Sequence, residues 1–224
     1  MGLIILLVGL LLTMWAQWKV RSSFQKWSHV PATVNLTGKE IARNILDQHG
    51  LTDVRVEPIR GFLTDHYDPT QRVVRLSEAV YEQSSVAAIS VAAHECGHAI
   101  QHQEDYGALV LRHRLMPLFQ FTSGLAPWLI LAGLFFQVTG LFLLGILFFS
   151  VAVLFHLITL PIEFNASTRA EKILLHQSYI DGNEQAGVRE VLGSAAFTYV
   201  ASALIALMEL FRFIMIFMLQ RDRD

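Results

Sequence analysis

Two histidines and a glutamate lie at a spacing that suits metal chemistry. They belong to the pentapeptide HECGH, which places His94, Glu95 and His98 in the largely apolar stretch 84–102, SSVAAISVAAHECGHAIQH. That pattern predicts a buried helix. Residues four apart share one face of a helix, so His94 and His98 can each offer an imidazole nitrogen to one metal ion. Glu95 is rotated about 100° from His94 and is placed to reach a water bound to that metal.

These groups predict a zinc site that activates water. HExxH supplies two neutral imidazoles and an acidic general base, and Zn²⁺ in such a site lowers the pKa of its water to about 7. A histidine pair at this spacing also occurs as an ordinary core feature, but the apolar helical context favours metal binding. We predict one Zn²⁺ per chain, bound by His94 and His98, with Glu95 as the catalytic base. Cys96, the single cysteine, faces roughly the opposite side of the helix and is expected to pack in the core.

A catalytic zinc site needs a third protein ligand, and Glu163 is the best candidate. It lies in the polar segment 161–170, PIEFNASTRA, after two long apolar runs that return the chain to the side of the membrane it left. Pro161 predicts that a new helix begins there, with Glu163 in its first turn. That position by itself also favours a glutamate, because the positive end of the helix dipole attracts negative charge.

Four other residues remain open as the third ligand: His102, Glu104, His113 and Glu171. His102 follows His98 by one turn of the same helix, so its ring is expected to lie too far from a metal held by His94 and His98. The longer pattern HExxHxxGxxH is absent, since Gln101 replaces its glycine and Glu104 its last histidine. Metzincin-type ligation is therefore not expected.

The composition is that of a membrane protein with a small polar domain. Hydrophobic residues make up 53% and charged residues 16% of the 224 residues, and the mean hydropathy is +0.44. The net charge of −2, without a basic run interleaved with aromatics, gives no indication of nucleic-acid binding. The predicted segments are an N-terminal transmembrane helix (1–18), a zincin-like catalytic segment with the HExxH helix (19–118), a transmembrane hairpin (119–160), a helical segment with the third ligand (161–192), and a C-terminal transmembrane helix and tail (193–224).

The polar segment after the first apolar run contains both helix and strand signals. Thr37-Gly-Lys-Glu40 resembles a capping box and predicts a helix that stops near Gly50. Short strands are predicted at 54–56 and 73–76. The residues DHYDPT at 65–70 predict a turn before the second strand, so a hairpin is expected.

The fold class expected from these signals is a mainly α membrane protein. It has about four transmembrane helices and a small α+β, zincin-like metalloprotease domain that carries HExxH on a helix. Lys19, Arg21 and Lys26 follow the first apolar run instead of preceding it. This order predicts an uncleaved span with a cytoplasmic segment after it, and an active site at the cytoplasmic face. The expected partners are the lipid bilayer and a peptide or membrane-protein substrate.

Three further stretches accompany HECGH: SVAAISVAA before it, LPIEFNASTRA at 160–170 and AAFTYVASA at 195–203. On these residues the chain resembles, over nearly its whole length, the YugP-type membrane-bound neutral zinc metallopeptidases of bacteria. It is more distantly similar to the HtpX heat-shock endopeptidases and the CAAX-prenyl endopeptidases, which also place spans between HExxH and a glutamate ligand. The resemblance implies a multi-pass protein of the bacterial plasma membrane and a gluzincin site with Glu163 as the third ligand.

The chain departs from those relatives at Ser167, four residues after Glu163, where they tend to have an aspartate. A carboxylate that would orient the zinc-binding helix is therefore missing, and the contacts behind the ligands must differ. The resemblance also implies that residues 61–68 supply an edge strand that pairs with an extended substrate. His66 or Tyr67 would then reach the site, although a turn role is equally consistent with the sequence DHYDP.

We therefore predict a membrane-embedded zinc endopeptidase. Glu95 takes a proton from the attacking water and delivers it to the leaving nitrogen. The group that assists the developing oxyanion stays open among Tyr199, His176, His66 and Arg169. One alternative is an inactive zinc-binding membrane scaffold, which would not need Glu95. The other is a transporter-like membrane protein with a regulatory metal site, whose polar path would consist of His156, Glu209 and Arg212.

Overall fold

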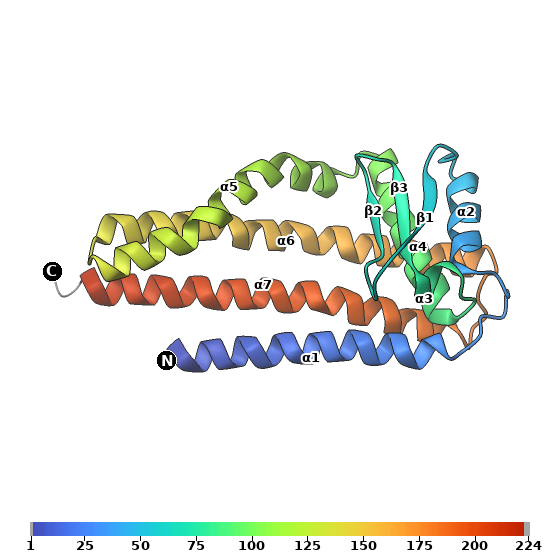
Figure 1. Cartoon of the computed structure of the whole chain (residues 1–224), viewed down its shortest axis with the longest axis horizontal. Helices are drawn as coiled ribbons and strands as arrows, with labels where there is room; N and C mark the ends of the chain where they lie inside the picture. Colours follow the sequence, from blue (N-terminus) through green and yellow to red (C-terminus); the bar gives the residue numbers. More distant parts are fainter. Residues whose placement is uncertain (1, 222–224) are drawn as a thin grey trace. The chain divides into compact units, whose positions relative to one another are not determined.

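The computed structural model describes residues 2–221. Its elements in chain order (Figure 1) are α1 (Gly2–Ser28), α2 (Gly38–Gln48), β1 (Arg55–Ile59), β2 (His66–Asp68), β3 (Val73–Ser77), α3 (Glu78–Tyr81), α4 (Val86–Gln103), α5 (Gly107–Phe135), α6 (Thr139–His176) and α7 (Gln185–Arg221). The chain forms two compact units. Of the described residues, one unit contains 2–15, 110–161 and 199–221, and the other contains 16–109 and 162–198.

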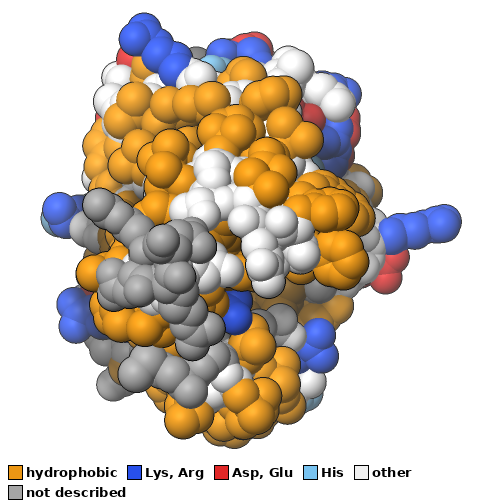
Figure 2. Space-filling view, turned by 90° about the vertical axis from the view of Figure 1, so that its left-hand side faces the viewer, with side chains coloured by type: hydrophobic (Ala, Val, Ile, Leu, Met, Phe, Trp, Pro, Cys, Tyr) orange, Lys and Arg blue, Asp and Glu red, His pale blue; other side chains and the backbone are white. Residues whose placement is uncertain are grey.

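Within the described residues, four helices are long and apolar enough to cross a membrane: α1, α5, α6 and α7. Large hydrophobic side chains on them are exposed, including those of Leu11, Trp128, Phe135 and Phe211. Hydrophobic side chains also cover most of the face seen in Figure 2, with few charged groups among them. So much exposed apolar surface suits lipid rather than water, and the number of candidate spans is the number expected from the sequence.

The spanning helices are longer than the apolar runs that predict them. Helix α1 continues to Ser28, and α5 begins at Gly107 rather than near residue 119. The prediction that a new helix begins at Pro161 is wrong, because Pro161 lies inside the continuous helix α6. Proline removes one N–H from the helix, and a long helix tolerates that single loss when the turns on both sides remain bonded.

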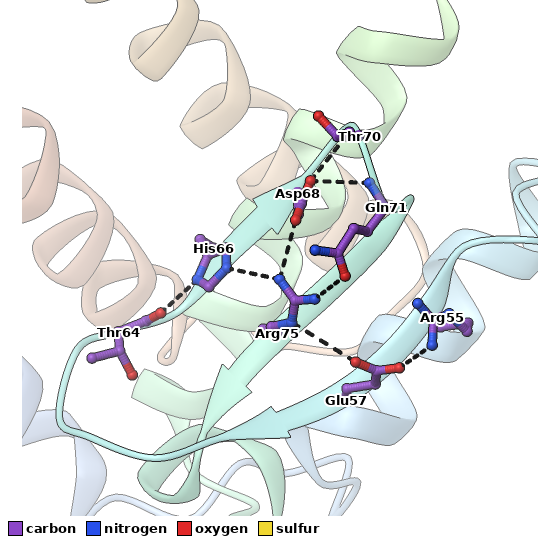
Figure 3. Close-up of polar contacts among 8 residues, drawn as sticks. All are labelled: Arg55, Glu57, Thr64, His66, Asp68, Thr70, Gln71 and Arg75. Carbon is purple, nitrogen blue, oxygen red and sulfur yellow. Dashed lines mark hydrogen bonds and ion pairs between the residues drawn. The ribbon is translucent and has the colours of Figure 1, made fainter.

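The small sheet has the strand order β1-β3-β2. Strand β1 pairs with β3 in parallel, and β2 pairs with β3 antiparallel. The two predicted strands therefore do not form the expected hairpin, because they run parallel. A hairpin is present instead between β2 and β3, and its first strand, His66–Asp68, lies inside the segment predicted as a turn. The turn comes later because the side chain of Asp68 accepts hydrogen bonds from the backbone N–H groups of Thr70 and Gln71 (Figure 3).

Helix α4 lies in the core of the second unit, against α2, α3 and the sheet. Its side chains from Val86 to Ile89 are fully buried, as is Cys96. The predicted capping box is present at α2: the hydroxyl of Thr37 accepts from the N–H of Glu40, whose carboxylate accepts from the N–H of Thr37. This packing covers one side of α4, and its other face packs against α6.

Candidate metal centre

Helix α4 carries His94, Glu95 and His98 in its middle turns. Its start is capped by Ser85, whose hydroxyl accepts the N–H of Ala88 at 3.2 Å. The two imidazole rings lie on one face of the helix, with ring centroids 4.7 Å apart and ring planes at 84°. Both Nε2 atoms point to a common position beside α6.

Glu163 of α6 completes the group. Its Oε2 lies 3.5 Å from Nε2 of His94 and 3.5 Å from Nε2 of His98, and its side chain is only 4% exposed. That oxygen is buried without a hydrogen-bond partner among the described residues, which is costly for a carboxylate unless a cation satisfies it. Tetrahedral zinc with bonds of about 2.0–2.1 Å separates its ligand atoms by about 3.3 Å. The three residues therefore fit a zinc ion.

The close approach of α6 to α4 depends on a glycine within the motif. A β carbon at Gly97 would lie 2.9 Å from the carbonyl oxygen of Ala166 on α6. No ordinary side chain fits at that distance without a shift of the backbone. Gly97 lies between the two histidines in sequence and Ala166 follows Glu163 by three residues, so this contact brings the ligands of the two helices within reach of one another.

Glu95 lies on the same helix but outside the ligand group. It is 7% exposed. Burial raises the pKa of the Glu95 carboxyl, although His94 and His98 oppose that shift, and the carboxylates of Asp65 and Glu163 add to it. A buried carboxylate with a raised pKa beside the two imidazoles of the candidate metal centre is suited to accept and release a proton.

Both histidines are also held through their second ring nitrogen. The hydroxyl of Ser167 lies 3.2 Å from Nδ1 of His94, at the position where the related families tend to have an aspartate. Oε1 of Gln101 lies 3.0 Å from Nδ1 of His98. From the sequence, Gln101 was predicted only to break the metzincin pattern, not to contact a histidine of the site. A sequence signal for this contact was nevertheless present, because Gln101 is a polar residue about one turn after His98 on the same helix.

The other candidate ligands have different partners. Glu104 pairs with Arg169 at 2.6 Å, and Glu171 accepts from Arg189 at 2.6 Å. Nδ1 of His102 lies 2.8 Å from the hydroxyl of Tyr67 on β2. Among the described residues, the potential ligand atoms that lie within 4.8 Å of one another belong to His94, His98 and Glu163. His113 belongs to α5, outside the unit that holds these three residues.

Two of the candidates for assisting the oxyanion are engaged elsewhere. His66 contacts the carbonyl oxygen of Thr64 through Nδ1 and the guanidinium of Arg75 through Nε2, on the face of the sheet seen in Figure 3. Arg169 bonds to Glu104 and to Asn165. The partners of both side chains are thus residues other than His94, His98 and Glu163.

Known proteins similar to this chain are described as zinc peptidases or membrane proteases. Residues 2–218 match the family described as "Putative neutral zinc metallopeptidase". The chain is 59% identical over 213 residues to the protein called "Putative membrane protease YugP" from Bacillus subtilis (strain 168), and the match covers 95% of each chain. No solved structure matches the chain.

Proposed function

Because the chain belongs to the family described as "Putative neutral zinc metallopeptidase", we propose that it is a multi-pass membrane zinc endopeptidase of the gluzincin type. His94, His98 and Glu163 hold one Zn²⁺, and Glu95 is the general base. The observation that carries this proposal is the buried Oε2 of Glu163, which lies 3.5 Å from the Nε2 atoms of both histidines. A carboxylate from a second helix thus supplies the third protein ligand that a catalytic zinc site needs.

The groups of the site have separate roles in peptide hydrolysis. A bound zinc ion supplies Lewis acidity, which polarises the scissile carbonyl and lowers the pKa of water. Glu95 accepts a proton from the attacking water and donates it to the leaving amide nitrogen, so that the C–N bond breaks as an amine and a carboxylic acid form. Burial supports this role, because it raises the pKa of Glu95 and allows its carboxylate to hold a proton between the two transfers.

Strand β2 is the proposed docking edge for an extended peptide. Among residues 2–221 it pairs on one side only, with β3, and it contacts α4. Tyr67 of β2 bonds to His102, one turn after the ligand His98. A peptide added to this edge would be held by its main chain with little choice among side chains. Unfolded or extended segments of membrane proteins are therefore suitable substrates.

The proposed location is the bacterial plasma membrane, with the active site on the cytoplasmic side. Four apolar helices support a multi-pass protein, and the Bacillus subtilis relative is called a membrane protease. The basic residues Lys19, Arg21 and Lys26 lie at the end of α1. Basic residues near a span favour the cytoplasmic face.

The experiment that tests this function combines zinc content with proteolysis. Zinc is measured by atomic emission on detergent-purified protein, and cleavage is measured on an unfolded casein-like substrate. Wild type is expected to hold one zinc per chain and to cleave. Glu163→Ala should lose both, whereas Glu171→Ala, the same change two turns further along α6, should retain both. Full zinc occupancy in Glu163→Ala would remove Glu163 from the ligand set, and zinc without any cleavage in wild type would favour the scaffold alternative.

A further inference from the structure

A buried glutamine contacts the second histidine of the candidate metal centre, and we propose that Gln101 is the positioning residue that sets how His98 binds zinc. This inference rests on the proposed function. Gln101 follows His98 by three residues on α4 and has no exposed surface. Its Oε1 lies 3.0 Å from Nδ1 of His98. Gln101 acts through His98 and touches neither substrate nor metal.

The orientation of the Gln101 amide is determined by its neighbours on α6. Its Nε2 donates to the carbonyl oxygen of Ile162 at 2.8 Å and to Oδ1 of Asn165 at 2.9 Å. A backbone carbonyl only accepts, so the group that faces Ile162 must be the NH₂.

Asn165 gives a second, independent constraint. Its Oδ1 also accepts the Nε–H of Arg169 at 2.7 Å. A guanidinium only donates, so the atom of Asn165 that faces both Arg169 and Gln101 must be the oxygen. Gln101 must therefore donate to Asn165 as well, and its single oxygen is left for His98.

This orientation assigns the tautomer of the neutral His98 ring. The amide oxygen of Gln101 can only accept, so Nδ1 of His98 carries the proton. The lone pair then lies on Nε2, the atom 3.5 Å from Oε2 of Glu163. In the opposite tautomer an N–H would occupy that direction and exclude a metal. In the metal-free protein Gln101 thus already holds His98 in the tautomer that can bind zinc.

The two histidines are not held in the same way. Nδ1 of His94 faces the hydroxyl of Ser167 at 3.2 Å, and a hydroxyl both donates and accepts. Ser167 therefore tolerates either tautomer of His94, whereas Gln101 tolerates one tautomer of neutral His98. Gln101 also links α4 to α6, the helix that supplies Glu163. One side chain therefore sets the tautomer of His98 and helps to hold the helix that carries Glu163.

The test compares Gln101→Met with Gln103→Met in the full-length protein in detergent. Methionine has a similar length but makes none of the amide hydrogen bonds, and Gln103 is exposed at the end of the same helix. Two quantities are measured: the zinc dissociation constant, by competition with a chelator, and the ring ¹⁵N shifts of labelled histidine in the metal-free protein at a pH where His98 is neutral. His98→Gln identifies the His98 signals by their absence.

In wild type we expect His98 to be protonated at Nδ1 without metal. Gln101→Met should weaken zinc binding by about 10- to 100-fold and should give a mixture of His98 tautomers. Gln103→Met should change neither. Activity as a function of zinc concentration is a third readout: Gln101→Met should lose activity at low zinc concentration and recover it at saturating zinc.

Two results would overturn the inference: a zinc affinity of Gln101→Met within about a factor of two of wild type, or an Nε2-protonated His98 in metal-free wild type. If Gln101→Met does not fold, Asn165→Leu removes one of the two anchors of the amide, and an unchanged zinc affinity in that variant counts against the inference. Wild type that binds no zinc would contradict the proposed function itself, whereas zinc in wild type with unaffected variants would contradict only the role of Gln101.

Discussion

Gly97 of α4 and Ala166 of α6 approach so closely that a β carbon at Gly97 would lie 2.9 Å from the Ala166 carbonyl oxygen. Because this oxygen belongs to the backbone, it cannot move aside as a flexible side chain would. Any larger residue at position 97 must therefore push the two helices apart. The same two helices carry His94, His98 and Glu163, so the geometry of the ligand group depends on this contact.

Gly97→Ala is expected to weaken zinc binding and proteolysis together. Forcing one methyl group into a packed contact costs about 1–3 kcal/mol, and the shift would move Glu163 away from the histidines. Zinc affinity and casein cleavage measure the effect. Gly193→Ala on α7 is the matched control, since it brings the same gain in helix propensity at a site with no neighbour within 4 Å of the added carbon. Equal zinc affinity in both variants would show that the helix contact does not set the ligand geometry.

Ser167 is expected to tune the affinity of His94 for zinc. Its hydroxyl contacts Nδ1 of His94 at 3.2 Å. Ser167→Ala removes this contact and should weaken zinc binding by up to about tenfold. Ser167→Asp offers a carboxylate to the same nitrogen, which makes the imidazole a stronger ligand, and should tighten binding relative to wild type. Chelator competition gives both affinities, and a tighter complex with Ser167→Ala than with Ser167→Asp would be contrary to this assignment.

Zinc is expected to stabilise the fold through Glu163. Without a cation the buried Oε2 of Glu163 has no hydrogen-bond partner among the described residues. A ligand that binds only the folded state at 100 times its dissociation constant adds about 2.7 kcal/mol to the free energy of unfolding. Chelation should therefore lower the apparent Tm of wild type in detergent, and added zinc should restore it. Glu163→Ala should show almost no response to either treatment.

Asp65 is expected to make the metal-free protein less stable as the pH rises. Burial raises the pKa of its carboxyl, although hydrogen bonds from the backbone and hydroxyl of Ser77 oppose the shift. The folded state therefore holds this proton to a higher pH than the unfolded state does. The resulting stabilisation is complete below the unfolded value of about 3.9 and disappears as the pH rises through the folded value.

Asp65→Asn removes this titration and can keep both contacts with Ser77. Apparent Tm values are measured from pH 4 to pH 7 with a chelator present, because zinc binding has its own pH dependence. The Tm of wild type should fall relative to that of Asp65→Asn across this range. A difference in Tm that is constant with pH, or that changes in the opposite direction, would be incompatible with a raised pKa.

Several features could be predicted from the sequence because their signals are local. The apolar stretch around HECGH corresponds to α4, and the pattern of Thr37 and Glu40 corresponds to the cap of α2. The apolar runs correspond to the four long helices. Arg212 also donates a hydrogen bond of 2.8 Å to Glu209, three residues before it on α7. In each case the interacting residues lie within one or two turns of one another, so the local sequence contains both partners.

Local signals were misleading where long-range packing outweighs them. Pro161 has the preference of a first helical residue, yet it lies inside α6. Ile162, Ala166 and Ala170 follow it at helical spacing and are fully buried, so packing continues the helix past the proline. Residues 65–70 have turn composition, yet His66 to Asp68 form a strand, because β3 offers them a partner. Pairing with a neighbouring strand satisfies backbone groups that a turn would leave to water.

The sequence alone determined which residues can do chemistry: an i, i+4 pair of imidazoles, an adjacent carboxylate, and a short choice of third ligands. Helical periodicity is enough for that, because it places His94 and His98 on one face whatever surrounds them. Only the tertiary structure decided that Glu163 faces both histidines, that Gly97 admits α6, and that Gln101 bonds to His98 while held by Ile162. Apart from the bond of Gln101 to His98, which are three residues apart, those relationships join residues about 60 or more positions apart. Their geometry comes from the packing of two helices rather than from any local pattern.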